Sequence, residues 1–363
     1  MTRSSQRLHA LAGSLPKLRV DYFLVTHLSN IRYLCGFTGS AGALLVGAKE
    51  PVFFTDGRYT EQAREQVRGA SITIEKKSPL VAAAEWLKAK RPGTLGIESD
   101  HLTVASEARL RRVLPKPCRL RPLSGAVERQ RTIKDAAETC LIREAVNLGS
   151  SLFPSLVKTI RPGVPETTVA AKLEFAARQA GAEGMSFDTI IAAGPRSALP
   201  HGRASATPIP RQGFVVLDFG VILAGYCSDM TRTVALGRPS AKERGWYDAV
   251  LDAQLAGIAA VRPGVTAGEV DEAARKVLKL NKLAKYYTHS TGHGVGLEIH
   301  ESPRLAAGET TVLEPGMVLT IEPGVYVPGQ GGVRIEDMIL VTKTGCDVLT
   351  PTTKELITVS HTA

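Results

Sequence analysis

The sequence predicts two domains, an α/β domain followed by an α+β domain that is built as an internal duplication. Three observations support this prediction. The chain has 363 residues, which is long for one domain, and its 44% hydrophobic content can fill two cores. Strand-like and helix-like segments alternate in its first third. In the remainder an Arg-Pro-Gly-Val sequence occurs twice, and helices precede hairpins in each half.

The first domain is expected to alternate short apolar strands with helices between residues 17 and 130. The expected strands are Asp21–Thr26, Ala43–Val46, Val52–Thr55 and Leu95–Glu98, and the expected helices are Thr60–Val67, Leu80–Lys90 and Val104–Val113.

A basic stretch between Arg109 and Lys134 carries much of the net charge of +10. No aromatic residue lies within it to stack on bases, so nucleic-acid binding is not expected. Three prolines, at positions 115, 117 and 122, make part of it irregular. We interpret it as a solvated helix face and a linker, and we expect the domains to be residues 1–132 and 133–363.

The second domain contains a repeat. Ile160–Val164 reads Ile-Arg-Pro-Gly-Val, and Val261–Val265 reads Val-Arg-Pro-Gly-Val, 101 residues later. Helix-like stretches follow the two copies, at 166–180 and 268–280. Each half then continues with a histidine (His201 or His300), a buried strand and a pair of acids. This shared order predicts two copies of one unit related by a pseudo-twofold axis, with a site where they meet.

Each acid pair is placed as if across a β-hairpin. Asp218 and Asp229 flank a turn expected between Leu223 and Ala224, and Glu322 and Glu336 flank one centred on Gly329. Facing residues of a hairpin have Cβ atoms roughly 4.5–5.5 Å apart. Two carboxylates at that distance repel unless a proton or a cation lies between them.

The acids are also expected to be buried, because continuous apolar runs precede Asp218 and Glu322. A buried carboxylate must be paired, protonated or bound to metal. His293, between two glycines in Thr-Gly-His-Gly-Val-Gly, adds an imidazole to the four carboxylates. Such a set suits two divalent ions roughly 3.5–4 Å apart. We therefore predict a dinuclear site whose ligands are Asp218, Asp229, His293, Glu322 and Glu336.

Other functional classes find little support. The glycines around His293 lack the strand–turn–helix context of a dinucleotide fingerprint. No apolar run reaches the roughly 18 residues of a membrane span, so a membrane protein is not expected. Five scattered cysteines without a Cys-x-x-Cys motif favour reduced thiols and a cytoplasmic protein, and the start of the chain does not read as a secretory signal.

Long motifs relate the chain to a family. From about Ile133 onward it resembles the pita-bread metallopeptidases, and within them the aminopeptidase P and prolidase branch. The first 132 residues resemble the creatinase-type N-terminal domain. The matching segments are Asn30–Leu34, Gly36–Ser40, Thr55–Tyr59, Ser186–Ile191, Ala198–Gly202, Asp218–Gly220, Cys227–Thr233, Thr288–Glu301, Ile321–Gly324 and Val333–Asp337.

The resemblance implies how the site residues divide their roles. Asp229 and Glu336 would bridge two metal ions, Asp218 would complete the shell of one, and His293 and Glu322 that of the other. Oxygen-rich ligation suits Mn²⁺, with Co²⁺ or Zn²⁺ as alternatives.

Five residues are expected to take part in the chemistry. Glu322 would act as general base. His201, His289 and His300 are candidates for donating to the oxyanion and positioning the substrate. Arg334, on the strand face of Glu336, would pair either a substrate carboxylate or the acid cluster.

The substrate class also follows from the resemblance, which implies cleavage of Xaa-Pro bonds in proline-containing peptides and a homodimer. A short gap between Ser302 and Ile321 favours an Xaa-Pro aminopeptidase over an Xaa-Pro dipeptidase, in which Arg334 or Arg304 would grip the dipeptide's carboxylate. A metal-free creatinase-like enzyme and a non-catalytic binding protein are remoter alternatives, because both would be expected to lack ligands that are present here.

Overall fold

Two separately packed units, Met1–Arg131 and Thr132–Ala363, make up the chain, and the computed structural model describes residues 2–359 of it. The division lies one residue before the expected boundary. The buried Arg131 donates to the side chain of Asn30 in the first unit. Lys134 instead pairs with Glu301 and donates its backbone N–H to Gly316, both in the second.

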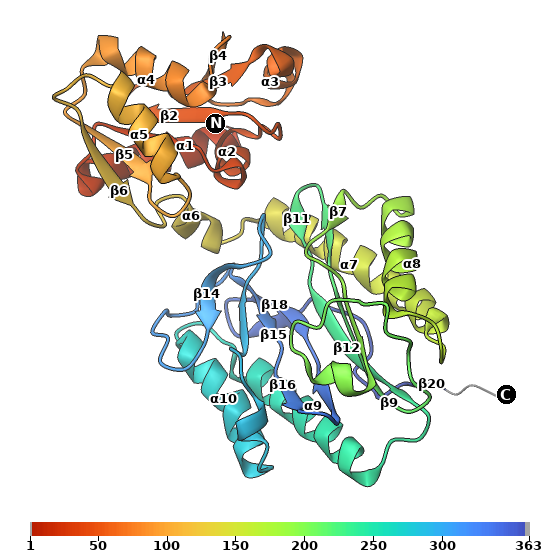
Figure 1. The fold of residues 1–363 in the computed structure, drawn as a ribbon. Coiled ribbons are helices and arrows are strands. Elements are labelled where there is room, and N and C mark those ends of the chain that lie inside the picture. The colour runs from red at the N-terminus through yellow and green to blue at the C-terminus, as the bar shows by residue number, and fades with distance from the viewer. Residues whose placement is uncertain (1, 360–363) are drawn as a thin grey trace. The chain divides into compact units, whose positions relative to one another are not determined.

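The first unit contains a six-stranded sheet in the order β4-β3-β2-β1-β5-β6. The strands are β1 (Tyr22–Val25), β2 (Ala43–Gly47), β3 (Val52–Asp56), β4 (Ser71–Glu75), β5 (Thr94–Glu98) and β6 (Arg119–Leu123); the helices are α1 (Arg3–Leu18), α2 (Leu28–Cys35), α3 (Thr60–Gln66), α4 (Pro79–Lys90), α5 (Val104–Val113) and α6 (Glu128–Thr132). Figure 1 shows helices on both sides of this sheet.

The expected strands and helices of this unit are all present, but five of the elements given above were not predicted: α1, α2, β4, β6 and α6. Helix α1 has a sequence reason, since Leu8, Leu11 and Leu15 recur at helical spacing and are buried. Strand β6, in the basic stretch, tolerates Pro122 because it lies at the sheet edge.

The second unit opens each half with two helices joined at the Arg-Pro-Gly-Val sequence. These helices are α7 (Ala136–Thr159) and α8 (Glu166–Gln179) in one half, and α9 (Ala241–Ala260) and α10 (Ala267–Leu280) in the other. Gly163 and Gly264 have φ of 84° and 89°, a conformation that only glycine adopts without strain. The two sequence copies therefore make the same turn, which supports the predicted duplication.

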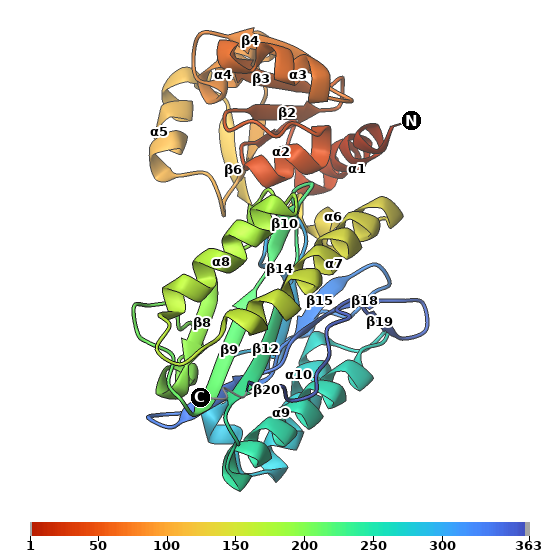
Figure 2. The ribbon, with the colours of Figure 1, turned by 90° about the vertical axis from the view of Figure 1, so that its right-hand side faces the viewer.

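The strands of the second unit lie between these helix pairs (Figure 2). One sheet has the order β20-β12-β9-β8 and packs on α7 and α8, and another has the order β14-β13-β15-β18-β19 and packs on α10. Smaller sheets are β11-β10-β7 and β16-β17. The strands are β7 (Gly184–Met185), β8 (Ile190–Ala193), β9 (Gly213–Phe219), β10 (Val221–Leu223), β11 (Tyr226–Cys227), β12 (Met230–Leu236), β13 (Gly292–Gly294), β14 (Glu301–Leu305), β15 (Val318–Ile321), β16 (Gly324–Val327), β17 (Gly331–Arg334), β18 (Asp337–Val341), β19 (Cys346–Val348) and β20 (Thr358–Val359).

The hairpin register expected for the two glutamates is confirmed. Ile321 pairs with Asp337, and Gly324 pairs with Arg334. Continuing either register places Glu322 opposite Glu336, with the turn at Gly329.

The register expected for the two aspartates is wrong by two residues. Asp218 pairs with Thr231 rather than with Asp229. Ala224 and Gly225 both have positive φ, 46° and 81°, which is the two-residue turn that matches strand twist, so the hairpin centres between them. Asp229 consequently lies diagonal to Asp218 on the same strand face, because side chains alternate with a period of two.

Among residues 2–359, no helix is long and apolar enough to cross a membrane.

Candidate metal centre

All five predicted ligands lie at or beside strand ends in the second unit. Asp218 is near the end of β9, and Asp229 directly precedes β12. Glu322 directly follows β15, and Glu336 directly precedes β18. His293 is the middle residue of β13. Backbone pairing in two sheets therefore fixes the positions from which these side chains extend.

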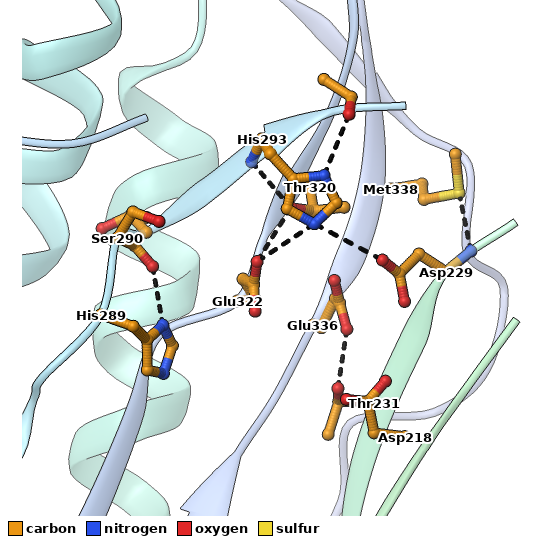
Figure 3. A network of polar contacts seen from close by, with 12 residues as sticks. Asp218, Asp229, Thr231, His289, Ser290, His293, Thr320, Glu322, Glu336 and Met338 are labelled. Carbon is orange, nitrogen blue, oxygen red and sulfur yellow. Dashed lines mark hydrogen bonds and ion pairs between the residues drawn. The ribbon is translucent and has the colours of Figure 1, made fainter. Parts of the chain in front are cut away.

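The side chains converge on a common centre (Figure 3). One ligand atom each from Asp229, His293 and Glu336 lies within 4.8 Å of the other two. The Nε2 atom of His293 lies 3.6 Å from Asp229 Oδ2 and 3.4 Å from Glu322 Oε1. These separations exceed a good hydrogen bond and leave room between the atoms.

Hydrogen bonds fix the orientation of the imidazole. His293 Nδ1 donates to the carbonyl of Gly294 over 2.9 Å, and its backbone N–H donates to Thr320 Oγ1. With the proton on Nδ1, the lone pair of Nε2 points at Asp229 and Glu322. Burial lowers the pKa of His293 to about 4, so the ring is neutral and can act as a ligand at pH 7.

The negative charge of each carboxylate destabilises the ionised form of its neighbours. Burial raises the pKa of Asp229 and of Glu336 well above the ordinary values, and the neighbouring acids raise them further. Burial also raises the pKa of Glu322 to about 8, against the opposing effect of Arg334. Without a cation, the cluster at neutral pH must hold extra protons.

The donor set fits divalent metal ions. It provides four carboxylates and one neutral imidazole nitrogen, which are ligands suited to Mn²⁺, Co²⁺ or Zn²⁺. The buried Oδ1 atom of Asp218 has no hydrogen-bond partner among residues 2–359. A buried acceptor without a partner is costly, and a cation would satisfy it. Asp218 and Glu322 lie outside the tightest group of three.

Arg334 is committed to the acid cluster. Its guanidinium is buried and donates to Asp218 Oδ2, Thr231 Oγ1, the hydroxyl of Tyr326 and the carbonyl of Pro200. Of the two roles considered for Arg334, this geometry favours pairing with the ligands. Four of its five N–H donors are used in this way, which leaves too few to hold a substrate carboxylate through two parallel hydrogen bonds.

His289 is likewise committed. Its Nδ1 atom contacts the carbonyl of Ser290 at 2.8 Å, and its Nε2 atom contacts the hydroxyl of Tyr326 at 2.8 Å. Burial lowers its pKa to about 4. A neutral ring that donates from Nδ1 must accept at Nε2, so His289 has no donor left for an oxyanion. It orients Tyr326, and through Tyr326 it supports Arg334.

His201 and His300 remain open to solvent. The ring of His300 lies edge-on to that of His293, with centroids 4.5 Å apart. Partial desolvation lowers the pKa of His300, and the electrostatic effect of the His201 imidazole lowers it further. Burial is the main cause of the lowered pKa of His289, and the His201 imidazole also contributes to it. The two exposed imidazoles are therefore close enough to influence each other beside the ligands.

Arg304 lies on the same strand pair as a ligand. It pairs with His293 across β13 and β14, and its side chain is exposed. Directly paired residues project from the same face of a sheet. The guanidinium makes no hydrogen bond or ion pair within the described part of the chain. Unlike Arg334, it is a cation beside the cluster that has no ion-pair partner among residues 2–359.

Three supporting residues were missed by the sequence analysis. Thr231 donates its hydroxyl to Glu336 over 2.7 Å, and Tyr326 links Arg334 to His289. Thr231 and Tyr326 each lie an even number of residues from a predicted ligand. This spacing could have placed both side chains on the strand face of the site. Asp271, fully buried on α10, accepts from the N–H and hydroxyl of Thr291 just before β13. Nothing in the local sequence distinguishes Asp271 from a solvated helix acid.

Comparison with known proteins gives two family matches. Residues 140–343 match the family described as Metallopeptidase family M24, and residues 7–133 match the Creatinase/Prolidase N-terminal domain.

Individual relatives match over nearly their whole length. A solved Xaa-Pro dipeptidase from Bacillus anthracis is 43% identical, with a TM-score of 0.95 over 98% of this chain and 100% of that one. An Xaa-Pro dipeptidase of Pyrococcus horikoshii is 37% identical over 97% of this chain and 99% of its own. A solved X-Pro aminopeptidase from Thermotoga maritima is 32% identical, with a TM-score of 0.88 over 97% of this chain and 100% of that one.

Proposed function

Because this chain belongs to metallopeptidase family M24 and has a creatinase/prolidase N-terminal domain, we propose that it is a dinuclear metal-dependent dipeptidase that hydrolyses Xaa-Pro dipeptides. Residues 1–132 would form the N-terminal domain, and residues 133–363 would form the pita-bread catalytic domain found in the solved prolidases.

The five clustered residues Asp218, Asp229, His293, Glu322 and Glu336 would hold the two ions, since they supply the buried donors of the second unit. When bound, divalent ions supply a nucleophilic water at neutral pH and polarise the scissile carbonyl. Mn²⁺ is our first choice, because carboxylate-rich sets suit it.

The chain's own residues would handle protons and orientation. Glu322, whose pKa burial raises, is suited to accept a proton from the attacking water. His201 and His300, exposed beside the cluster, would donate to the oxyanion and orient the peptide. Arg334 would hold Asp218 in place, and Tyr326 and His289 would hold Arg334.

The observation that carries the choice of a dipeptide is Arg304. A dipeptide places a free carboxylate directly after the proline ring, close to the scissile bond. Arg304 has no carboxylate partner in the part of the chain that the structure describes, and it is paired in register with His293, so it provides the matching charge. A guanidinium can bind a carboxylate through two parallel hydrogen bonds.

This proposal departs from the preference for an aminopeptidase that the sequence analysis expressed. That preference rested on the short gap between Ser302 and Ile321. The Bacillus anthracis protein, named an Xaa-Pro dipeptidase, aligns over the full length of its chain, so a short gap is compatible with dipeptidases. Aminopeptidase activity remains the second candidate, favoured by the likeness to the Thermotoga maritima enzyme.

One comparison of substrates tests the proposal. We expect kcat/KM for an Xaa-Pro dipeptide to exceed that for the matching Xaa-Pro-Xaa tripeptide and for the dipeptide amide, which lacks the carboxylate charge. Arg304→Gln should remove most of this preference while leaving the bound metal unchanged. Cleavage of the tripeptide at least as well as the dipeptide by the wild-type protein would instead make it an aminopeptidase.

Two broader properties also belong to the proposal. The family resemblance supports a homodimer, which sedimentation of the metal-loaded protein would test. The five cysteines are scattered and free in the structure, and we infer a cytoplasmic protein from their number and spacing.

A further inference from the structure

The segment that carries His201 is an irregular loop held at its two ends by a single carboxylate. This loop, residues 194–204, follows β8 and contains a short 3₁₀ helix, Gly194–Ala198. Irregular segments depend on specific contacts for their conformation, because they lack the continuous backbone pairing of sheets and helices. The position of His201 therefore depends on whatever fixes the loop.

The carboxylate belongs to Glu166, the first residue of α8, whose side chain is fully buried. At the start of the loop, Glu166 Oε1 accepts from the backbone N–H of Ala193 over 2.9 Å. At the end of the loop, Oε2 accepts from the N–H and the hydroxyl of Ser205, over 3.0 and 2.7 Å.

Arg196 completes this arrangement from within the loop. Its Nε–H donates to both oxygens of Glu166, and its Nη2 donates to the carbonyl of Arg203, two residues after His201. The backbone adds a further link, since Thr167 N–H donates to the carbonyl of Ser205. One ion pair thus connects the first helix turn of α8 to both ends of the loop.

The far side of the loop touches the metal centre. Arg334, which pairs with Asp218, also donates to the carbonyl of Pro200, the residue before His201. Gly332 N–H donates to the hydroxyl of Ser197. The loop is therefore held between Glu166 at its base and β17 at its tip, and Glu166 itself touches none of the ligand residues.

We propose that Glu166 is a positioning residue that sets the placement of His201, and through it the rate of peptide hydrolysis. This inference rests on the proposed function, since it takes His201 to contact the substrate. Displacing a group by about 1 Å can cost on the order of 10² in rate. The ligands lie at strand ends fixed by sheet pairing, so their positions should not depend on Glu166.

The chemistry of the contacts requires a carboxylate. Every group facing Glu166 is a donor: two backbone N–H groups, a hydroxyl and a guanidinium. A glutamine of the same shape has one oxygen and one NH₂ group, so it would present a donor to the donors at one end of the loop. Glu166→Gln should release that end without leaving a large cavity.

The test compares Glu166→Gln with Glu174→Gln, a control that removes an exposed carboxylate from the same helix. We expect Glu166→Gln to lower kcat/KM for an Xaa-Pro dipeptide by roughly 10- to 100-fold at unchanged metal content. Glu174→Gln should leave both quantities unchanged. Wild-type kcat/KM in Glu166→Gln would refute the proposal.

A double-mutant cycle with His201→Ala shows whether Glu166 acts through His201. If it does, adding Glu166→Gln to His201→Ala should cost little further activity. An equal loss in the two backgrounds would mean that Glu166 serves general stability, and the proposal would fall. Should Glu166→Gln fold poorly, Ser205→Ala removes one contact at one end and enters the same cycle, with a smaller loss expected.

Amide hydrogen exchange tests whether Glu166 fixes the loop, independently of whether the protein cleaves Xaa-Pro dipeptides. Protection of residues 193–205 should fall in Glu166→Gln and not in Glu174→Gln. If the wild-type protein cleaves no Xaa-Pro dipeptide, the proposed function fails while exchange still reports on the loop. Unchanged protection in Glu166→Gln would overturn the role of Glu166 itself.

Discussion

Asp337, directly after the predicted ligand Glu336, is the centre of a buried ionic network that should contribute strongly to the stability of the second unit. Its side chain is fully buried and accepts from Arg232, Gln254 and Lys354, over 2.7, 2.9 and 2.7 Å. Arg232, only 2% exposed, also donates to the carbonyl of Glu336 and to the carbonyls of Thr352 and Thr353. The network thus ties β12, α9 and β18 to the segment before β20.

Asp337→Ala would leave the buried cation of Arg232 without its counter-charge. Removing one partner of a buried ion pair costs about 3–5 kcal/mol. For a unit of this size, each kcal/mol lowers Tm by about 2–4 °C. We therefore expect Asp337→Ala to lower Tm by roughly 6–20 °C.

The assay is calorimetric unfolding in chelator, so that metal binding does not add to stability. The control is Asp347→Ala, which also removes an aspartate paired with an arginine, Arg143, but at sites 53% and 42% exposed. Exposed pairs contribute about 0–1 kcal/mol, so the control should lower Tm by less than about 4 °C. Equal shifts in the two variants would refute the argument that burial sets the cost.

Three further predictions concern the metal centre. Chelation should abolish dipeptide hydrolysis and Mn²⁺ or Co²⁺ should restore it; full activity in protein that elemental analysis shows to be metal-free would contradict the assignment. Asp229→Ala should lose metal and activity together, whereas His300→Ala should keep its metal and lose roughly 10²–10³ in kcat; equal metal loss would place His300 among the ligands. The raised pKa values of Asp229, Glu322 and Glu336 mean that the metal-free native state binds more protons than the unfolded chain between the ordinary imidazole pKa of roughly 6.5 and about 8. Below that window the lowered pKa values of His289 and His293 act in the opposite direction. Denaturant unfolding of metal-free protein should show stability falling as pH rises through that window, and a rise there would refute the electrostatic account.

The acid pairs show how far sequence patterns reach. The turn at Gly329 gave the register of Glu322 and Glu336 correctly, because glycine marks its centre. The same reasoning failed by two residues for Asp218 and Asp229. There the turn residues are Ala224 and Gly225, and alanine carries no signal that it adopts positive φ. Since an error of two residues preserves the strand face, Asp218 and Asp229 still project from the same face of the hairpin.

Residue roles were harder to predict than residue identities. Arg334 was expected either to pair with the acids or to bind substrate. Its hydrogen bonds to the carbonyl of Pro200 and the hydroxyl of Tyr326 decide between these two roles. His289 was expected to be able to donate to substrate, yet both its ring nitrogens are engaged. Two of these partners, Pro200 for Arg334 and Tyr326 for His289, lie 134 and 37 residues away along the chain, so local spacing does not show that they are hydrogen-bonded to these side chains.

The sequence by itself determined the two-domain organisation, the duplicated helix pairs and the four acids and one histidine predicted to bind metal, Asp218, Asp229, His293, Glu322 and Glu336. Those features are encoded locally, in apolar periodicity, in turn residues and in acids placed next to buried strands. Only the tertiary structure decided which side chains remain free to meet a substrate and which are held by neighbours. Arg304 and Arg334 both lie near predicted ligands in the sequence. Within residues 2–359, Arg304 is exposed and has no ion-pair partner, whereas Arg334 is buried among four acceptors. That difference arises from which strands and loops pack against each residue, and packing between distant segments leaves no local trace in the chain.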